Sequence, residues 1–583
     1  MSENRKNPNK KRKKKKSFRP VITAILLAVV VMGAVLWFIR YAPTTERMEL
    51  SDFYRYSTPN EAALISDGQY LEPADDEAPY AIVRDGAAYI SIRKLKELYD
   101  DGYVWDPTEN IIRYATATSI VNIDLNADPY NYTDGGEPKS LSVPAAVTED
   151  GADGMLYIAV DLVCQYTDIT VASIDQDPGR IVIETPGYAK QVAQVSRNAV
   201  MRRFGGPKSK IVGDVKKQDS VSVVEDYGKW CQILTEDGIL GCVKSSQLGP
   251  KQEQVTEARL PERTYEHMSM GVPVVLTWHQ VTNQTANEYL GSVLAPVQGV
   301  NVISPTWFYL NDNQGGIGDL TDPGYVEKAH ANGLLVWALV SNFENREVDT
   351  TTVLNTTSSR DRVVDSLINS TLAAGADGIN VDFEELSINV RDGYVQFIKE
   401  LSIRCEQNGL YLSVDNYPPS EYTDFYNRSM QADYADYVVL MGYDEYNGSS
   451  TTAGPTASLP YVIQSLEDTL TEVPSNQLIL GMPFYTRLWK TENGQLSTQA
   501  MGMNAVEELL STTGSEKSWL ENEQLNYTEY MEGDALCQIW IEDGESLSKK
   551  MALVSSYELA GGAFWKLGLE TPEIWETIHM YFP

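Results

Sequence analysis

An unbroken apolar run near the start dominates the pattern of hydrophobic and polar positions along this chain. Val21–Ile39 reads VITAILLAVVVMGAVLWFI, holds no charged residue and is followed by Arg40. As an α-helix it would be roughly 28 Å long, close to the ~30 Å hydrocarbon core of a bilayer. The pattern predicts one uncleaved transmembrane anchor over 21–40. A cleaved signal peptide or a buried core helix shares this pattern, but no small-x-small cleavage site follows the run.

Shorter apolar runs recur through residues 267–583 at intervals typical of alternating strands and helices. Eight of them are β-rich, and they begin at Val272, Gly299, Leu334, Asp377, Leu410, Asp436, Gln477 and Gly561. Amphipathic stretches such as 363–374, 393–408 and 461–470 separate them. Eight buried parallel strands joined by crossover helices predict an α/β fold, a (β/α)8 TIM barrel. The long gap before the eighth run predicts an insertion with strands of its own.

Residues 76–187 contain a weak internal repeat. Segments starting at Tyr89 and Tyr157 each predict a strand, a short helix, a strand, an acidic turn with proline and a last strand. This pattern resembles the copper amine oxidase N-terminal-like domain of bacterial surface proteins, which implies an α+β stalk or wall-binding module. The name implies no copper here, because the segment offers no histidine cluster. Residues 41–75 are polar and predict a linker.

Residues 188–250 change to short alternating strands broken by turn sequences, which predicts a small all-β domain. The stretch DSVSVVEDYGKWCQILTEDGILGCVKSSQL, which contains Trp230, loosely resembles a bacterial Src-homology-3-like (SH3-like) domain. Such domains bind wall peptide or polysaccharide, or only space other domains. Residues 251–266 predict a second linker, so the chain is predicted to be multidomain.

Charge divides at the apolar run. The 583-residue chain has a formal net charge of −34, yet residues 1–20 hold ten Lys or Arg and one Glu, which leaves −43 for the rest. By the positive-inside rule, the lysine-rich run 10–16 places residues 1–20 in the cytoplasm and the later domains outside. The acidic excess of those domains excludes a generally basic nucleic-acid binder. Hydrophobic residues make up 43% of the chain, as expected for folded domains.

The five cysteines and four histidines give little support for a disulfide scaffold or a metal centre. The cysteines are widely spaced, and neither a CxxC nor an HExxH motif occurs. Cys231 and Cys242 flank a predicted hairpin turn, where they either face each other or are two small buried residues. No metal or organic cofactor is implied.

The fourth run of the predicted barrel carries the strongest chemical signal. In DGINVDFEEL side chains alternate, so Asn380, Asp382 and Glu384 share one face of the strand. TIM-barrel active sites lie at the C-terminal ends of strands, which places Glu384 at the rim. The Asp382 carboxylate and partial burial would raise the pKa of Glu384 and make it a general acid. A polar network without catalysis is the alternative, and Glu385 is expected to be a surface carboxylate.

DGINVDFE resembles the DxxDxDxE signature of glycoside hydrolase family 18, the chitinase-like hydrolases, and the likeness covers nearly all of the predicted barrel. The segment Met441–Asp444, MGYD, resembles the family's sixth-strand MxYD, and Trp565 its eighth-strand tryptophan. Asn380 stands where many chitinases have Asp. Asn at this position is familiar in the bacterial cell-wall and spore-cortex branch of the family. It would hydrogen-bond Asp382 without sharing a proton with it.

The resemblance implies retaining, substrate-assisted hydrolysis. Glu384 would protonate the glycosidic oxygen while the substrate's own N-acetyl carbonyl attacks the anomeric carbon. Asp382 would orient the acetamido group. Tyr443 would hydrogen-bond the acetamido oxygen with help from Asp444, and Trp565 would form the floor of the sugar subsite. Glu384, Asp382 and Tyr443 are thus the implied catalytic residues.

Further candidates lie at the ends of other strands. The expected substrate-binding residues are Asn380, Met441, Asp444, Trp565, Asp415, Tyr485 and Arg487. Arg487 would bind substrate, for example a muramyl carboxylate, or only a neighbouring Asp. Trp278 and Trp307 would be subsite walls or barrel packing, and His279 and Asn342 have no assigned role.

The combined expectation is a membrane-anchored extracellular glycoside hydrolase at the cell wall. It would cleave β-1,4 bonds after N-acetylglucosamine in peptidoglycan or a related wall glycan, with the membrane as its other partner and no nucleic acid. The tether favours wall glycan over free chitin. A chitinase acting on chitin oligomers and a catalytically silent glycan-binding wall protein are the alternatives. Silent members usually lose the acid, whereas Glu384 and Asp382 are both present.

Overall fold

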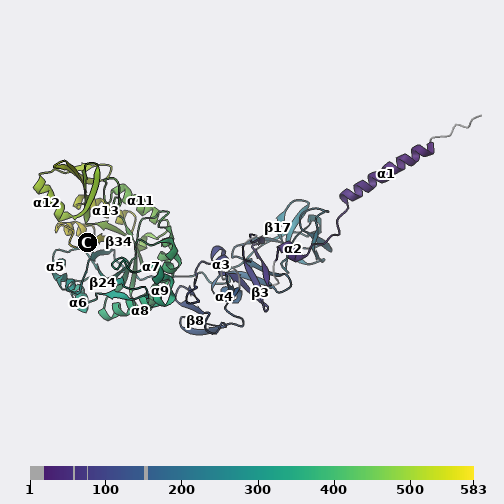
Figure 1. Ribbon diagram of the computed structural model, residues 1–583, viewed down its shortest axis with the longest axis horizontal. Coiled ribbons are helices and arrows are strands. Elements are labelled where there is room, and N and C mark those ends of the chain that lie inside the picture. The colour runs from purple at the N-terminus through teal and green to yellow at the C-terminus, as the bar shows by residue number, and fades with distance from the viewer. Residues whose placement is uncertain (1–18, 57–59, 75–76, 150–154, 583) are drawn as a thin grey trace, which may run out of the picture. The chain divides into compact units, whose positions relative to one another are not determined.

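The computed structural model in Figure 1 describes residues 19–582 apart from 57–59, 75–76 and 150–154. The lysine-rich run 10–16 lies outside the described residues. The chain forms two compact units, and neither is continuous in sequence. One unit holds residues up to Tyr99 together with Ala146–Pro261. The other holds Asp100–Ala145 together with Glu262–Pro583 and contains the predicted barrel.

Eight parallel strands close into the barrel that the apolar runs predict. They are β21 (Val274–His279), β22 (Val302–Leu310), β24 (Leu335–Ser341), β25 (Gly378–Asp382), β26 (Tyr411–Asn416), β27 (Tyr437–Met441), β28 (Leu478–Pro483) and β34 (Gly561–Trp565). Each strand pairs with the next, and β21 pairs with both β22 and β34, which closes the barrel. A short strand, β23 (Ile317–Asp319), adds antiparallel to the end of β22. The barrel prediction is confirmed.

Helices surround these strands, as Figure 1 shows around β24 and β34. The two longest, α8 (Thr357–Ala374) and α9 (Arg391–Asn408), contain predicted amphipathic stretches. They end at Gly375 and Gly409, whose φ angles of 75° and 66° are left-handed and cost glycine no Cβ clash. The other barrel helices are α5 (Leu290–Leu294), α6 (Pro323–Ala331), α7 (Thr350–Asn355), α10 (Arg428–Tyr434), α11 (Leu459–Thr469), α13 (Gly544–Ser556) and α14 (Ile574–Tyr581).

The lower part of the barrel interior is filled by large side chains. Trp337 lies beside Tyr411 and Tyr437, with ring centroids 5.4 and 5.5 Å away. On the outer face of β25, Ile379 and Val381 pack into the core shared with the helices. A filled interior leaves only the strand ends for chemistry.

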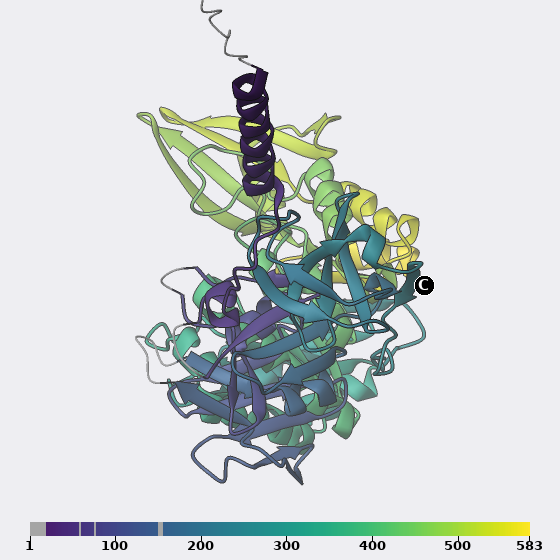
Figure 2. The same ribbon diagram turned by 90° about the vertical axis from the view of Figure 1, so that its right-hand side faces the viewer.

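The insertion before β34 forms a separate sheet, the yellow-green strands of Figure 2. Its order is β30-β29-β33-β32-β31, all antiparallel. The elements are β29 (Tyr485–Glu492), β30 (Gln495–Gly502), α12 (Met503–Thr513), β31 (Ser518–Leu520), β32 (Leu525–Glu532) and β33 (Ala535–Ile541). Trp489 is buried in this sheet, and its Nε1 donates to the Gly454 carbonyl oxygen at 2.8 Å. The insertion is thereby fixed to the loop after β27.

A second antiparallel sheet packs on the barrel although it precedes it by more than a hundred residues. Its order is β5-β6-β7-β8-β9. The strands are β5 (Tyr103–Asp106), β6 (Ile111–Ala115), β7 (Ile120–Asp124), β8 (Asn131–Asp134) and β9 (Glu137–Ser140). The Asp106 carboxylate accepts from the backbone N–H of Thr357, 2.7 Å away, at the start of α8. Tyr434 of α10 donates to the Ala115 carbonyl oxygen at 3.2 Å, so several barrel helices hold the sheet.

The first unit contains two sheets. One has the order β10-β11-β4-β3-β1-β13-β12, with β2 paired to β1. Its strands are β1 (Glu61–Ser66), β2 (Gln69–Leu71), β3 (Ala81–Arg84), β4 (Ala87–Ser91), β10 (Ala146–Glu149), β11 (Met155–Ala159), β12 (Thr170–Ile174) and β13 (Gly179–Glu184). The other runs β16-β15-β19-β18-β17-β14-β20. Its strands are β14 (Ala189–Gln194), β15 (Ala199–Arg202), β16 (Ile211–Val215), β17 (Ser220–Asp226), β18 (Trp230–Thr235), β19 (Leu240–Lys244) and β20 (Gln252–Val255).

The boundaries of these sheets differ from the expected ones. The stretch 41–75, expected to be a linker, contains α2 (Leu50–Tyr54), β1 and β2. Here β1 pairs in parallel with β13, because its apolar residues complete that sheet's core. Both copies of the repeat have the predicted strand–helix–strand–strand order, with helices α3 (Ile92–Leu98) and α4 (Val160–Tyr166). Their last hairpins go to different sheets: β5–β6 to the barrel unit and β12–β13 to β1.

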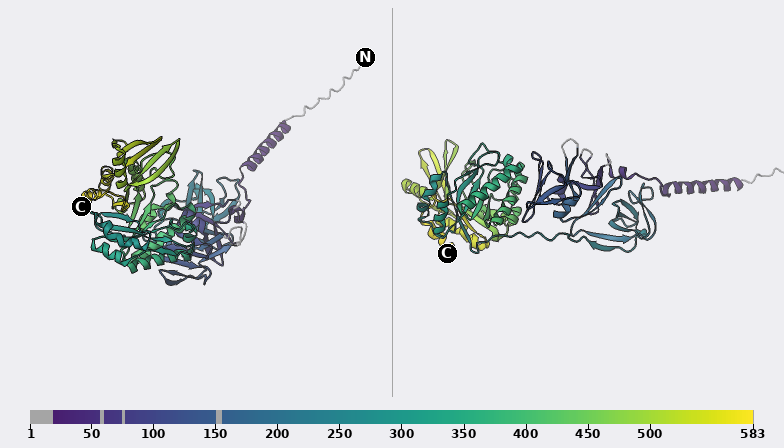
Figure 3. Two further views of the ribbon diagram at one scale, coloured as in Figure 1. Left: turned by 60° about the vertical axis from the view of Figure 1, so that its left-hand side comes forward. Right: turned by 90° about the horizontal axis from the view of Figure 1, so that it is seen from below.

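The apolar run forms helix α1 (Arg19–Tyr41), the straight purple helix of Figure 3. Among the described residues, Val21–Tyr41 is the one helix long and apolar enough to cross a membrane, with a mean hydropathy of 2.8. A signal sequence has the same properties. The buried core-helix alternative does not fit, because none of its apolar window is covered by the rest of the chain.

Cys231 and Cys242 do not face each other. Cys231 lies opposite Val243 in the β18–β19 ladder, and Cys242 lies opposite Gln232. Since side chains alternate along a strand, the two thiols are on opposite faces. Both are free and buried, as in the alternative of two small buried residues.

Replacing Glu400 by Gln should strongly destabilise the barrel unit. Its buried carboxylate lies 3.1 Å from Arg360 Nε and 3.6 Å from a nitrogen of Arg113, which comes from strand β6. The neutral amide would leave buried guanidinium charge without its counter-ion, at a cost of about 3–5 kcal/mol. The measurement is the free energy of unfolding of the full chain in urea. As control, Asp365→Asn removes the exposed pair with Arg404 and should cost under about 1 kcal/mol; equal losses would contradict the prediction.

Candidate active site

The alternation predicted along the fourth strand is present in β25. Asn380 and Asp382 lie on the inner face, and Phe383 points outward, where it stacks on Phe397 of α9 with centroids 5.3 Å apart. Glu384 follows the strand and is partly buried at its C-terminal end. The strand thus delivers two carboxyls to one end of the barrel.

Asn380 is the centre of a buried hydrogen-bond network across the barrel interior. Its Oδ1 accepts from Trp278 Nε1 at 2.9 Å and from Ser304 Oγ at 3.2 Å. Its Nδ2 donates to Ser413 Oγ at 3.0 Å and to Asp415 Oδ1 at 2.8 Å. Asn380 has no exposed surface and lies inside the barrel, which disfavours the expected contact with substrate. Its amide is used up by these partners and not by Asp382.

Asp415 is also buried, with only 2% of its surface exposed, because it is the acceptor for the Asn380 amide. Burial raises its pKa to about 8, although the hydrogen bond from Asn380 partly offsets this rise. Asp415 was expected to bind substrate, and the structure instead makes it a supporting group below the site.

Asp382 is a second buried acid at this end of the barrel, with 5% of its surface exposed. Burial raises its pKa well above the usual range, and the nearby carboxyls of Glu384 and Asp415 raise it further. Its Oδ1 is shielded from solvent and has no hydrogen-bond partner among the described residues. An unpaired buried carboxyl oxygen is costly unless it is protonated or meets a ligand donor.

Glu384 has a raised pKa for the same main reason, burial, with further contributions from the charges of Asp444, Glu385 and Glu344. The hydroxyl of Tyr417 donates to its Oε2, and this bond lowers the pKa of Glu384 in part. A carboxyl whose pKa is raised by burial can hold a proton nearer to neutral pH and donate it.

Two side chains at this site were missed or unassigned at the sequence level. Asn342, at the end of β24, accepts from the backbone N–H of Glu384 at 2.8 Å and donates to its carbonyl at 2.9 Å. It therefore fixes the backbone that carries Glu384. Tyr417 follows β26 directly, and its position after a barrel strand is the signal that would have identified it.

The residues of the MGYD segment lie beside this acidic pair. Tyr443 is buried next to Tyr485, with ring centroids 6.2 Å apart, and Met441 lies below it with 7% exposed. Asp444 has a left-handed φ of 61° and accepts from the Tyr485 hydroxyl at 2.7 Å. Arg487 lies 3.8 Å from Asp444. This contact fits the alternative in which Arg487 pairs with a neighbouring Asp.

Trp565 is half-buried at the end of β34, next to the fully buried Trp278, with ring centroids 5.6 Å apart. Trp278 and Trp307 are packing residues, since both are buried and donate to Asn380 and Asn287. Glu385 is exposed and pairs with Arg346 at 3.0 Å, as expected of a surface carboxylate.

His279 is a packing residue as well. Its Nδ1 lies 2.9 Å from the Tyr325 hydroxyl, and burial lowers its pKa to about 4, which keeps the ring neutral. Within the described residues no three His, Cys, Asp or Glu side chains are arranged to hold a metal ion. The site thus contains two acids with raised pKa values, one phenol bonded to the outer acid, and aromatic walls, which suits acid catalysis.

Several known proteins are similar to this chain. Residues 325–570 match the family model "Glycosyl hydrolases family 18". The "Cortical fragment-lytic enzyme" of Bacillus subtilis is 24% identical over 250 residues, 41% of this chain and 58% of the relative. The "Uncharacterized glycosylase YvbX" of the same species is 24% identical over 293 residues, 48% of this chain and 84% of the relative. The crystal structure of the Bacillus cereus spore cortex-lytic enzyme SleL is 19% identical with a TM-score of 0.49, over 60% of this chain and 80% of that one.

The family match covers six of the eight barrel strands, from β24 to β34, and includes the acidic pair of β25 and the MGYD segment. Residues 325–570 of this barrel are therefore a glycosyl hydrolase domain of family 18.

Proposed function

We propose that this hydrolase is anchored in the membrane and cleaves β-1,4 bonds after N-acetylglucosamine in peptidoglycan or a related wall glycan. The observation that carries the proposal is the pair Asp382 and Glu384 at the end of β25. Both are desolvated, both have raised pKa values, and the inner one keeps an oxygen without a partner. Such a pair is suited to a substrate that brings its own donor and nucleophile, as an N-acetyl sugar does.

In the proposed mechanism Glu384 protonates the glycosidic oxygen as the bond to the leaving sugar breaks. The acetamido carbonyl of the bound sugar attacks the anomeric carbon from the other face. The acetamido N–H donates to Asp382, which satisfies its unpaired oxygen and offsets the positive charge that develops. Water then attacks the anomeric carbon and its bond to the acetamido oxygen breaks, while Glu384, now ionised, accepts a proton from the water.

The neighbouring residues hold the sugar during these steps. Tyr443 hydrogen-bonds the acetamido oxygen, with Asp444 and Tyr485 beside it as a bonded pair. Trp565 supplies an apolar ring face for the pyranose. Asn342 hydrogen-bonds the backbone of Glu384, so the position of this acid relative to the glycosidic bond is fixed.

The choice of wall glycan is supported by the relatives and by the N-terminus. The cortical fragment-lytic relative and the glycosylase relative bear names of glycan-cleaving enzymes. Helix α1 has no charged residue from Val21 to Ile39, and ten basic residues within 1–20 favour a cytoplasmic N-terminus with the barrel outside. An enzyme on such a tether reaches polymer beside the membrane, which the wall supplies. The stretch 188–250, the proposed SH3-like module, and the repeat within 76–187 would then space the barrel from the membrane.

Replacement of Glu384 by Gln tests the proposal. The wild-type protein should release reducing ends from purified peptidoglycan, and mass spectrometry should find N-acetylglucosamine at each new reducing end. Glu384→Gln should lose about 10²–10⁴-fold in kcat, since the general acid is absent. Chitin oligomers serve as the second substrate. Cleavage of chitin alone would support a chitinase instead, and no reducing ends from either polymer would refute the proposal.

Tyr417→Phe should shift the pH dependence. The Tyr417 hydroxyl stabilises the ionised form of Glu384, so its loss raises the pKa of Glu384 and keeps the acid protonated at higher pH. The alkaline limb of kcat/KM should move up by about one pH unit, the size of one hydrogen bond to a charged group. Tyr422→Phe on the same loop is the control, because Tyr422 is 79% exposed. An unchanged limb in Tyr417→Phe would contradict the role of this bond.

A further inference from the structure

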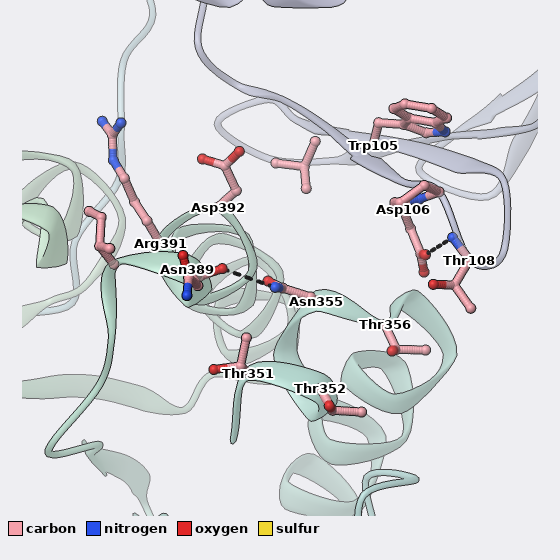
Figure 4. Close-up of a pocket in the computed structure, with 13 residues that line it drawn as sticks. Trp105, Asp106, Thr108, Thr351, Thr352, Asn355, Thr356, Asn389, Arg391 and Asp392 are labelled. Carbon is pink, nitrogen blue, oxygen red and sulfur yellow. Dashed lines mark hydrogen bonds between the residues drawn. The ribbon is translucent and has the colours of Figure 1, made fainter. Parts of the chain in front are cut away.

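A cavity of about 600 Å³ lies on the barrel unit outside the site already described. Figure 4 shows its walls: strand β5 with Trp105, the β5–β6 turn with Thr108, helix α7 with Thr351, and the segment that enters α9 with Asn389. A volume of this size is within the range of small-ligand sites. The sheet β5–β9 and the barrel line the cavity together, so neither part forms it alone.

The cavity presents hydrogen-bonding groups that the fold does not use. Among the described residues, the hydroxyls of Thr108, Thr351 and Thr356 and the side-chain amide of Asn389 have no hydrogen-bond partner. Trp105 adds an indole ring, and Ile388, 62% exposed, adds an apolar edge. Neutral hydroxyls and amides beside an indole match the hydroxyls and the apolar ring face of a sugar.

The charges of the cavity disfavour other ligands. Its ionisable lining residues are Asp106, Asp392 and Arg391, which sum to a negative charge. The Asp106 oxygens are occupied by the backbone N–H groups of Thr108 and Thr357. Arg391 lies 3.9 Å from Asp101. A phosphate or another polyanion would meet net repulsion here, whereas an uncharged saccharide would not.

The cavity lies on the loop that carries the proposed acid. Asn389 follows Glu384 by five residues, so their Cα atoms are at most about 18 Å apart. Helices α8 and α9 also begin beside the cavity, at the same end of the barrel as the strand C-termini. A polymer of several sugars bound at Glu384 therefore has the length to reach it.

We propose that this cavity is a secondary binding site for the glycan strand, remote from the bond that is cleaved. The proposal rests on the function proposed above and adds a length preference to it. Binding energy from remote sugars raises kcat/KM for long strands and gives nothing to short oligomers. An extended peptide is the competing occupant, because β5 is the edge strand of its sheet and edge strands pair with extended chains.

The test compares kcat/KM on long glycan strands freed of stem peptides with kcat/KM on a short oligosaccharide. Trp105→Ala should lower the value for long strands about tenfold, the loss of about 1.4 kcal/mol of binding, and leave the short substrate unchanged. Ile388→Ala with Asn389→Ala should act in the same direction. These two side chains are exposed, so the second variant serves if the first does not fold. Met531→Ala is the control, since Met531 is 60% exposed on the insertion.

Equal losses on long and short substrates, or no loss on long strands, would overturn the proposal. A direct binding assay separates it from the hydrolytic mechanism. Full-length Glu384→Gln protein should bind peptide-free glycan strands about tenfold more tightly than the same protein with Trp105→Ala added. Binding that requires stem peptides would assign the cavity to peptide and refute the glycan proposal. If wild-type protein cleaves no glycan, the proposed function fails, and this binding comparison still decides the cavity.

Discussion

The chemistry of the barrel depends on one buried amide, the side chain of Asn380. It accepts twice and donates twice, and its four partners come from β21, β22 and β26. An ionised Asp at the same position could only accept, so it would repel Asp415 instead of holding it. The amide hydrogen-bonds the polar groups of the barrel interior without adding a charge. The acidic groups above it, Asp382 and Glu384, then owe their raised pKa values first to burial and next to the charges of neighbouring carboxyls.

Much of the barrel could be predicted from sequence because its signals are periodic. A parallel strand buried on both faces reads as a short apolar run, and all eight runs are strands in the structure. The same alternation placed Asp382 and Glu384 at one strand end. Asp415 and Asn380 were placed on the correct strands, but alternation does not give depth along a strand. Only the three-dimensional packing shows that both are buried, with 0% of Asn380 and 2% of Asp415 exposed.

The remaining contacts could not be predicted from local sequence patterns, because the residues that meet are distant in sequence. The position of Tyr417 after β26 indicates a residue of the site, but no local pattern indicates that its hydroxyl meets Glu384, 33 residues away. The hairpin of the first repeat copy looks like that of the second, yet β5–β6 joins the barrel unit through contacts such as Asp106 with Thr357. Similar sequences take different neighbours here because the barrel surface offers a competing partner. Domain boundaries inferred from composition do not show that a hairpin packs on a different domain.

Because neither unit is continuous in sequence, the order of synthesis determines when each part of a unit can fold. Asp106 leaves the ribosome 251 residues before Thr357, its partner on α8. At about 5–20 residues per second, the sheet β5–β9 waits on the order of 10–50 s for the helices that cover it. Strand β1 likewise waits for β13. The nascent chain must carry uncovered apolar surface through that interval, so its yield depends on protection during synthesis as much as on the stability of the finished fold.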